Sequence, residues 1–161
     1  MKTAFFSLLL VLSFPFAADA EVVRLAPDFT WPGVGKARSL KSLRGQAVVL
    51  LIAESPRVGA FRKQVRWLEK SYASLAARGV VFVAALRSGD GPVQSNIPFV
   101  IAQNGGAVAQ AYNVRDEFAL VVIGKDGNLD YQTDRVRTGE RVRDVVQNAF
   151  PVQSASRKLP Q

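Results

Sequence analysis

The chain of 161 residues contains neither cysteine nor histidine. Without cysteine it can form no disulfide and no reactive thiolate, and we expect no lipid-modified cysteine of the bacterial lipoprotein type. Without histidine it lacks the Ser-His triad, the histidine general base and the usual zinc and copper ligand sets. Because only carboxylates, hydroxyls, lysine, arginine and tyrosine remain for chemistry, we expect a protein that is not an enzyme and that uses no cofactor and no metal.

Negative charge is scarce. Lysine and arginine number 21 against 13 aspartates and glutamates, which gives a formal net charge of +8. Such an excess favours anionic partners such as nucleic acid, acidic lipid headgroups or acidic polysaccharide, but it also suits a surface whose charges only contact water. Aromatic residues are not interleaved with the basic ones at a regular spacing, so we expect no dedicated nucleic-acid binding.

The N-terminal residues have the pattern of a secretory signal peptide. Lys2 precedes an apolar run over residues 4–16, and Ala18-Asp19-Ala20 matches an A-x-A cleavage site. The run is short and interrupted, so we expect no transmembrane segment once residues 1–20 are removed. Removal leaves the net charge unchanged because Lys2 and Asp19 are both lost. We expect a periplasmic or secreted protein with one domain over residues 21–150 and a mobile tail over residues 151–161.

A buried strand followed by a long helix forms the centre of the mature sequence. Residues 48–53 are uniformly apolar and rich in β-branched side chains, which is typical of a strand covered on both faces. Ser55 is expected to cap the helix, Pro56 to begin it and Gly79 to end it. The apolar residues of this helix recur every three or four positions. They are Val58, Phe61, Val65, Leu68, Tyr72 and Leu75.

The remaining segments alternate strands and helices. Strands or extended segments are predicted over residues 80–86, 97–102, 118–123 and 128–132, and helices over residues 106–112 and 139–150. The strand over residues 48–53, the long helix and the strand over residues 80–86 form a strand–helix–strand unit. This order implies a right-handed crossover and parallel pairing of the two strands.

Turn and cap residues set the boundaries of these elements. Asn113 is a plausible left-handed cap, and Asp126-Gly127 predicts a hairpin turn. Thr138 is expected to cap the last helix and Pro151 to end it. The buried face of that helix is predicted to consist of Val142, Val145, Val146 and Ala149.

Five short motifs follow one another in the mature sequence. They are Ala26-Pro27-Asp28-Phe29-Thr30, Ser39-Leu40 through Arg44-Gly45, Pro98-Phe99-Val100-Ile101, residues 108–114 and residues 121–127. In this order, over residues 25–150, they resemble the thioredoxin-like superfamily, especially its thiol peroxidases and exported thiol-disulfide oxidoreductases. The resemblance implies an α/β fold, a thioredoxin-like three-layer sandwich with a mixed central sheet.

The same resemblance implies where a redox site lies in the family. By this resemblance the paired cysteines of the oxidoreductases would fall near Arg57 and Ala60, and the peroxidatic cysteine would fall near Phe61. The proline before the fourth core strand, usually cis in the family, falls at Phe118. None of these residues is retained, so the chain resembles the cysteine-free members of the superfamily. We expect no thiol chemistry and a trans peptide bond before Phe118. The vestigial active-site positions are Ser55, Pro56, Arg57, Ala60, Phe61 and Phe118.

Two polar pairs invite a functional interpretation. Glu54 and Ser55 follow the central strand, where α/β sheets often bind ligands, but no histidine or lysine motif completes a nucleophile, and a helix cap beside a surface charge explains them better. Asp126 and Asn128 suggest a metal site, but the hairpin turn explains them better.

Basic residues gather on the exposed face of the long helix. Arg62, Arg66 and Lys70 are one turn apart, Lys63 lies beside them, and Glu69 is the only acid of the helix. We predict that Arg62, Lys63, Arg66 and Lys70, here called the basic ridge, bind a partner; the alternative is a solvated face. A second basic cluster consists of Arg135, Arg137, Arg141 and Arg143.

These observations favour an exported, redox-inactive thioredoxin-like module that binds or scaffolds a protein partner. One alternative is an oxidoreductase-related enzyme that uses chemistry without cysteine or borrows a thiol from its partner. Another is a peripheral binder of an anionic envelope polymer or lipid. The sequence leaves the identity of the partner and the oligomeric state open.

Overall fold

The computed structural model describes residues 24–88 and 91–156. Five strands form one mixed sheet in the order β5-β4-β3-β6-β7. They are β3 (Val48–Ala53), β4 (Val81–Leu86), β5 (Val100–Ile101), β6 (Phe118–Ile123) and β7 (Leu129–Thr133). The β3–β4 and β4–β5 pairs are parallel, whereas β3–β6 and β6–β7 are antiparallel.

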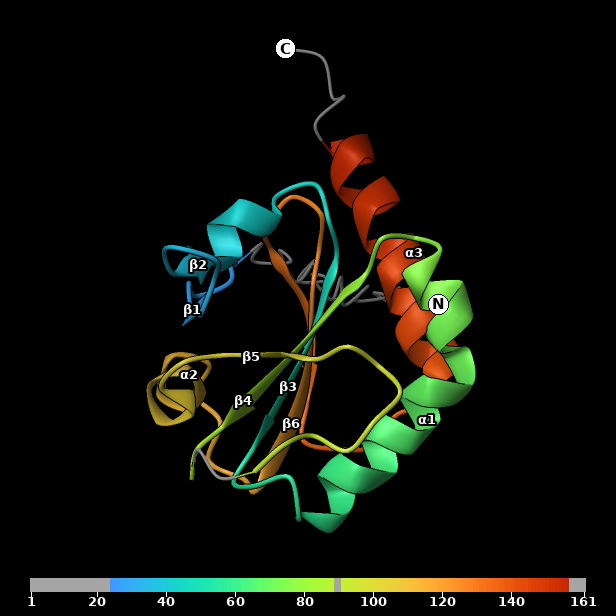
Figure 1. Cartoon of the computed structure of the whole chain (residues 1–161). Helices are drawn as coiled ribbons and strands as arrows, with labels where there is room; N and C mark the ends of the chain where they lie inside the picture. Colours follow the sequence, from blue (N-terminus) through green and yellow to red (C-terminus); the bar gives the residue numbers. More distant parts are fainter. Residues whose placement is uncertain (1–23, 89–90, 157–161) are drawn as a thin grey trace, which may run out of the picture.

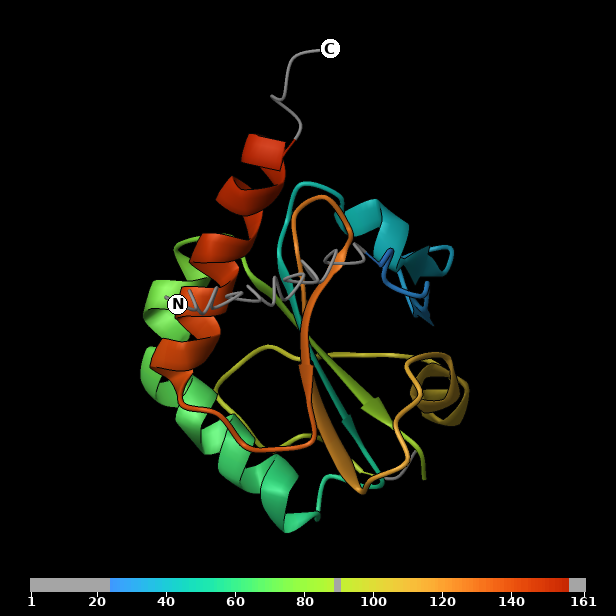
Figure 2. The same cartoon turned by 180° about the vertical axis from the view of Figure 1, so that it is seen from behind.

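The sheet lies between two layers. Helices α1 (Gly59–Ala76) and α3 (Gly139–Ser156) cover one face, and helix α2 (Gly105–Ala111) covers the other (Figures 1 and 2). A small sheet of β1 (Thr30–Trp31) and β2 (Arg38–Ser39) and the 3-10 turn η1 (Leu40–Leu43) lie on the α2 side. The predicted three-layer α/β sandwich with a mixed sheet is confirmed.

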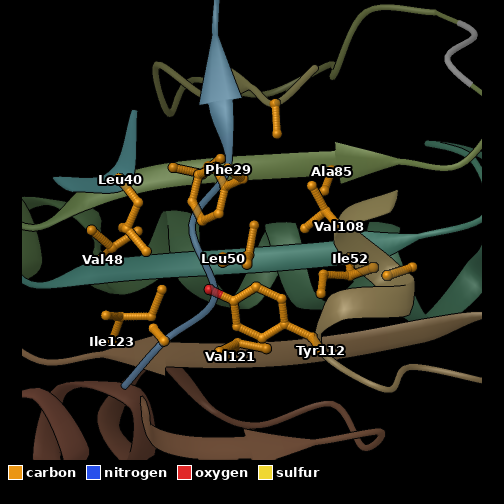
Figure 3. Close-up of a cluster of buried hydrophobic side chains, with 14 of the residues drawn as sticks. Phe29, Leu40, Val48, Leu50, Ile52, Ala85, Val108, Tyr112, Val121 and Ile123 are labelled. Atoms are coloured by element: carbon orange, nitrogen blue, oxygen red, sulfur yellow. The ribbon is translucent and has the colours of Figure 1, made fainter. Parts of the chain in front are cut away.

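Strand β3 is the centre of both cores. All six of its residues are buried, and successive side chains point to opposite faces as the strand period requires. Val48, Leu50 and Ile52 join the cluster on the α2 side, drawn in Figure 3, and the other three join the cluster beneath α1 and α3. A strand covered on both faces is uniformly apolar, which is why its predicted bounds were correct.

A buried tyrosine fastens the N-terminal segment over the first cluster. The ring of Tyr112 is almost fully buried, and its hydroxyl donates to the carbonyl of Pro27 at 2.8 Å (Figure 3). Burial, reinforced by the nearby negative charge of Asp28, raises the pKa of Tyr112 well above its ordinary value of 10.0.

Helix α1 begins later than predicted. The Val58 N–H donates to the Ser55 carbonyl at 3.3 Å, which closes a turn and leaves Val58 extended, with ψ 130°, as the N-cap of the helix. Ser55 therefore caps this turn and not the helix: its Oγ accepts from the Arg57 N–H at 3.3 Å. The predicted start at Pro56 was wrong because a separate turn, from Ser55 to Val58, lies between the end of β3 and the first turn of α1.

The rest of α1 follows the predicted pattern. Phe61, Val65, Leu68 and Leu75 are buried beneath the helix, Val58 and Tyr72 are partly buried, and Gly79 has the left-handed conformation at φ +70°. Its apolar stripe thus packs on the sheet as expected from its spacing.

The last helix runs past its predicted end. Thr138 Oγ1 accepts from the Arg141 N–H at 3.2 Å, as expected of a cap, but α3 continues through Pro151 to Ser156. A proline inside a helix costs one backbone hydrogen bond and crowds the carbonyl four residues earlier, but its fixed φ is helical, so a helix can continue past it at that cost. Val142, Val145 and Val146 pack on the sheet, whereas the side chain of Ala149, residues 1–20 and the end of the tail lie outside the described residues.

A buried glutamine joins α1 to the segment before α3. The side chain of Gln64 is fully buried; its Oε1 accepts from the Arg137 N–H at 2.7 Å and its Nε2 donates to the Arg137 carbonyl at 2.9 Å. Close by, Gly139 lies so near α1 that an added Cβ would be 2.6 Å from the Cβ of Ser71. The two helices are therefore held together by a polar clip and a close backbone approach.

Candidate functional site

Two of the positions predicted to be vestigial, Phe61 and Phe118, lie in one buried cluster beneath α1 and α3. Phe118 pairs with Ala53 across the antiparallel ladder, and Phe61 lies in the same buried cluster. Both aromatic side chains are about as buried as the central strand, at 1% exposed for Phe61 and 2% for Phe118. Apolar packing therefore occupies the places where the resemblance puts a peroxidatic cysteine and a proline.

The backbone before Phe118 is ordinary. Among residues 24–88 and 91–156 no peptide bond is cis, so the bond before Phe118 is trans, as predicted. Arg57 is exposed and Ala60 is half-buried.

The end of β4 carries a structural residue that the sequence analysis missed. Nη2 of Arg87 donates to the carbonyls of Val114 at 2.7 Å and of Asp116 at 2.8 Å, and Nη1 pairs with Glu54 Oε2 at 3.5 Å. Glu54 is thus held in an ion pair, and the Ser55 hydroxyl accepts from a backbone amide. The sequence feature that could have indicated Arg87 is its position as a single basic residue directly after a buried strand.

A groove of about 660 Å³ lies beside the first turns of α1. The helix forms one wall, the loop over residues 91–94 forms the other, and the turn at Pro56 and Arg57 closes one end. From α1 the lining includes Phe61, Arg62, Val65 and Arg66. The volume falls within the range of ordinary ligand pockets, about 300–1,000 Å³.

Two contacts hold the loop wall against the helix. The Glu69 carboxylate accepts from the Ser95 hydroxyl at 2.8 Å and from the Asn96 N–H at 3.0 Å. Glu69, the only acid of α1, therefore anchors the loop, and within the described residues it forms no ion pair with an arginine of the helix.

The groove is cationic. Arg57, Arg62 and Arg66 are exposed, and no carboxylate within the described part of the chain pairs with their side chains. The apolar side chains between them add a surface that water solvates poorly. This combination suits an anionic group attached to an apolar one.

The predicted basic ridge separates into two parts. Arg62 and Arg66 line the groove, whereas Lys63 and Lys70 do not, and the Lys63 ammonium lies 5.3 Å from the ring centre of Trp67. In the second basic cluster, Arg137 Nε donates to the Tyr131 hydroxyl at 2.8 Å. Binding by these residues stays a prediction.

The hairpin turn accounts for the other predicted polar pair. Asp126 Oδ1 accepts from the Asn128 N–H at 3.1 Å, and Asp126 Oδ2 accepts from the Asn128 side-chain amide at 2.8 Å. In the described ranges no three carboxylates stand close enough together to hold a metal ion, and no helix there is long and apolar enough to cross a membrane.

Comparisons with known proteins bear on the fold. The sequence matches no protein-family model and no curated protein. A structure from Chlorobium tepidum, described as the thiol:disulfide interchange protein DsbE, superposes with a TM-score of 0.67 at 22% identity, over 80% of this chain and 96% of that one. A thiol:disulfide interchange protein from Bacteroides sp. gives 0.63 at 16% identity, over 80% and 90%. Thioredoxin peroxidase I of Plasmodium yoelii gives 0.59 at 17% identity, over 84% and 92%.

Proposed function

From a thioredoxin-like fold that contains no cysteine, we propose that the chain is an exported, redox-inactive binding module that holds a protein partner in the groove beside α1. The observation that carries the proposal is the contrast between the packed positions of Phe61 and Phe118 and the open groove beside them. Phe61 and Phe118 fill the vestigial redox positions with packed apolar side chains, while the groove next to them is open and lined by unpaired arginines.

The redox part of the proposal follows from chemistry. Disulfide reduction, isomerisation and peroxide reduction by this fold need a reactive thiolate, and no residue of the chain supplies one. Assays of insulin reduction and of peroxide consumption should show no turnover above a control without protein. Turnover would refute the redox-inactive assignment and favour an enzyme that works without cysteine or with a partner's thiol.

Export is supported by the signal-peptide pattern over residues 1–20. We expect the mature chain in the periplasm or outside the cell. The measurement is the N-terminal sequence of protein recovered from the envelope fraction: a terminus near residue 21 agrees with export, and an intact Met1 in the cytoplasm contradicts it.

The binding part is tested by site-specific cross-linking. A photoreactive residue at Gln94, which lines the groove, should form an adduct with a partner protein, whereas the same residue at the exposed Gln103, outside the groove, should not. The adduct should also disappear in the double variant R62E/R66E. Equal adducts from both positions, or an adduct that survives the double variant, would show that this groove is not the binding site.

A peripheral binder of an anionic polymer or lipid is the second candidate, favoured by the net charge of +8. Such binding spreads over many exposed charges and weakens steeply as salt screens them over about 8 Å at physiological ionic strength. Retention on heparin that depends on net charge, and not on the groove arginines, would favour it.

A further inference from the structure

The two walls of the groove differ in chemistry. The α1 wall carries Arg62 and Arg66 above Phe61, which forms part of the floor. The loop wall carries Pro92 and Val93, and Val93 packs partly buried against the same apolar cluster as Phe61. A ligand that lies along the groove therefore meets charged side chains from α1 and from Arg57 at the end, whereas the loop side offers Pro92 and Val93 beside the uncharged Gln94.

The spacing of the arginines matches an extended peptide. Side chains one helical turn apart, such as Arg62 and Arg66, have Cβ atoms about 5–6 Å apart. In an extended strand, residues two apart point to the same side at a distance of about 6.6 Å, and the residue between them points to the opposite side. Two acidic residues separated by an apolar one thus place both carboxylates toward the arginines and the apolar side chain toward Val93.

We propose that the groove binds an extended acidic segment of the partner protein in which one apolar residue lies between two acidic ones. This rests on the proposed function and names the partner's chemistry. Arginine suits it because its planar guanidinium donates two parallel hydrogen bonds to one carboxylate. The groove is concave with an apolar wall, which fits a single chain with side chains on both sides and not a flat lipid surface.

The test uses a labelled peptide with the run Glu-Leu-Glu between Gly-Ser flanks, and fluorescence anisotropy with the purified chain. In R62E/R66E the affinity should fall about tenfold or more, because two attractive pairs become repulsive. The matched control K63E/K70E changes the same helix and the net charge equally, but neither residue lines the groove, so its loss should stay below about threefold. All four side chains are exposed, so both variants should fold, which circular dichroism checks.

The apolar wall is tested separately. A peptide with serine in place of the leucine keeps both charges, and it should bind several-fold more weakly because it buries less apolar surface against Val93. Equal losses in the two double variants, or equal binding of the leucine and serine peptides, would overturn the proposal. The alternative outcome is that the peptide does not bind, whereas the chain binds vesicles of phosphatidylcholine and phosphatidylglycerol in a way that depends on Arg62 and Arg66. That result would assign the groove to lipid instead.

The outcomes also separate this proposal from the binding function itself. A Gln94 adduct that depends on the groove arginines, together with a peptide that does not bind, would refute the acidic segment and keep the binding module. Absence of both the adduct and peptide binding would refute both.

Discussion

Replacement of Gln64 by leucine should destabilise the protein through the clip between α1 and α3. The side chain is fully buried and makes two hydrogen bonds, of 2.7 and 2.9 Å, to the backbone of Arg137. Leucine has a similar volume and leaves no large cavity, so the main effect is that the Arg137 N–H and carbonyl lose their partners.

The magnitude follows from the state of those two groups. A buried polar group left without a partner costs about 1–3 kcal/mol, and Arg137 is only half-buried, so water can reach part of its backbone. We expect the free energy of unfolding to fall by about 2–3 kcal/mol, a large share of the 5–15 kcal/mol typical of a domain. At about 4 °C per kcal/mol, the melting temperature should fall by about 10 °C.

Urea unfolding followed by tryptophan fluorescence measures this loss, and Trp67 lies on α1 close to the clip. The control is Gln110→Leu, an exposed glutamine of α2, which should change the free energy by less than about 0.5 kcal/mol. If Gln64→Leu lost no more than this control, the two hydrogen bonds would contribute nothing net to stability, and the clip would not be what joins the helices.

Two further substitutions test the packing. Gly139→Ala should lower the free energy of unfolding by about 1–3 kcal/mol in the same urea assay. The new methyl group would meet the Ser71 side chain and lie 2.9 Å from the Trp67 carbonyl oxygen. Unchanged stability would mean that α3 can move away from α1 at no cost. Burial raises the pKa of Tyr112, so its stabilising effect is complete below the unfolded pKa of about 10 and is lost as pH rises toward the folded pKa. Tyr112→Phe, which also removes the hydrogen bond to Pro27, should be less stable near neutral pH but lose less stability above pH 10; parallel curves for the two proteins would contradict this.

The local sequence pattern was sufficient for most elements. Apolar runs predicted β3 and β6 with the bounds that the structure shows, and the left-handed conformation expected at Asn113 is present at φ +54°. These features depend on neighbouring residues only, since burial on both faces requires a continuous apolar run and a left-handed cap requires a tolerant residue. The predictions that failed lie at helix ends: α1 begins only after a turn closed by the Ser55 carbonyl, and α3 continues past Pro151.

The excluded chemistry was also a property of the sequence alone. A chain without cysteine and histidine has no thiolate and no imidazole in any fold, so the sequence alone excludes the chemistry that depends on these groups. The exposed arginines of α1 were likewise visible from their helical spacing.

Only the tertiary structure decided which of those basic residues share a site. The groove exists because the loop over residues 91–94 packs beside α1, held by Glu69 through Ser95, a contact between residues 26 apart in the chain. That contact places Arg62 and Arg66 opposite Val93 and leaves Lys63 and Lys70 outside. Which basic residues of α1 line the groove depends on how the chain after β4 runs back along that helix. Such long-range packing leaves no periodic signal in the sequence, because it is set by the shapes of the two surfaces that meet.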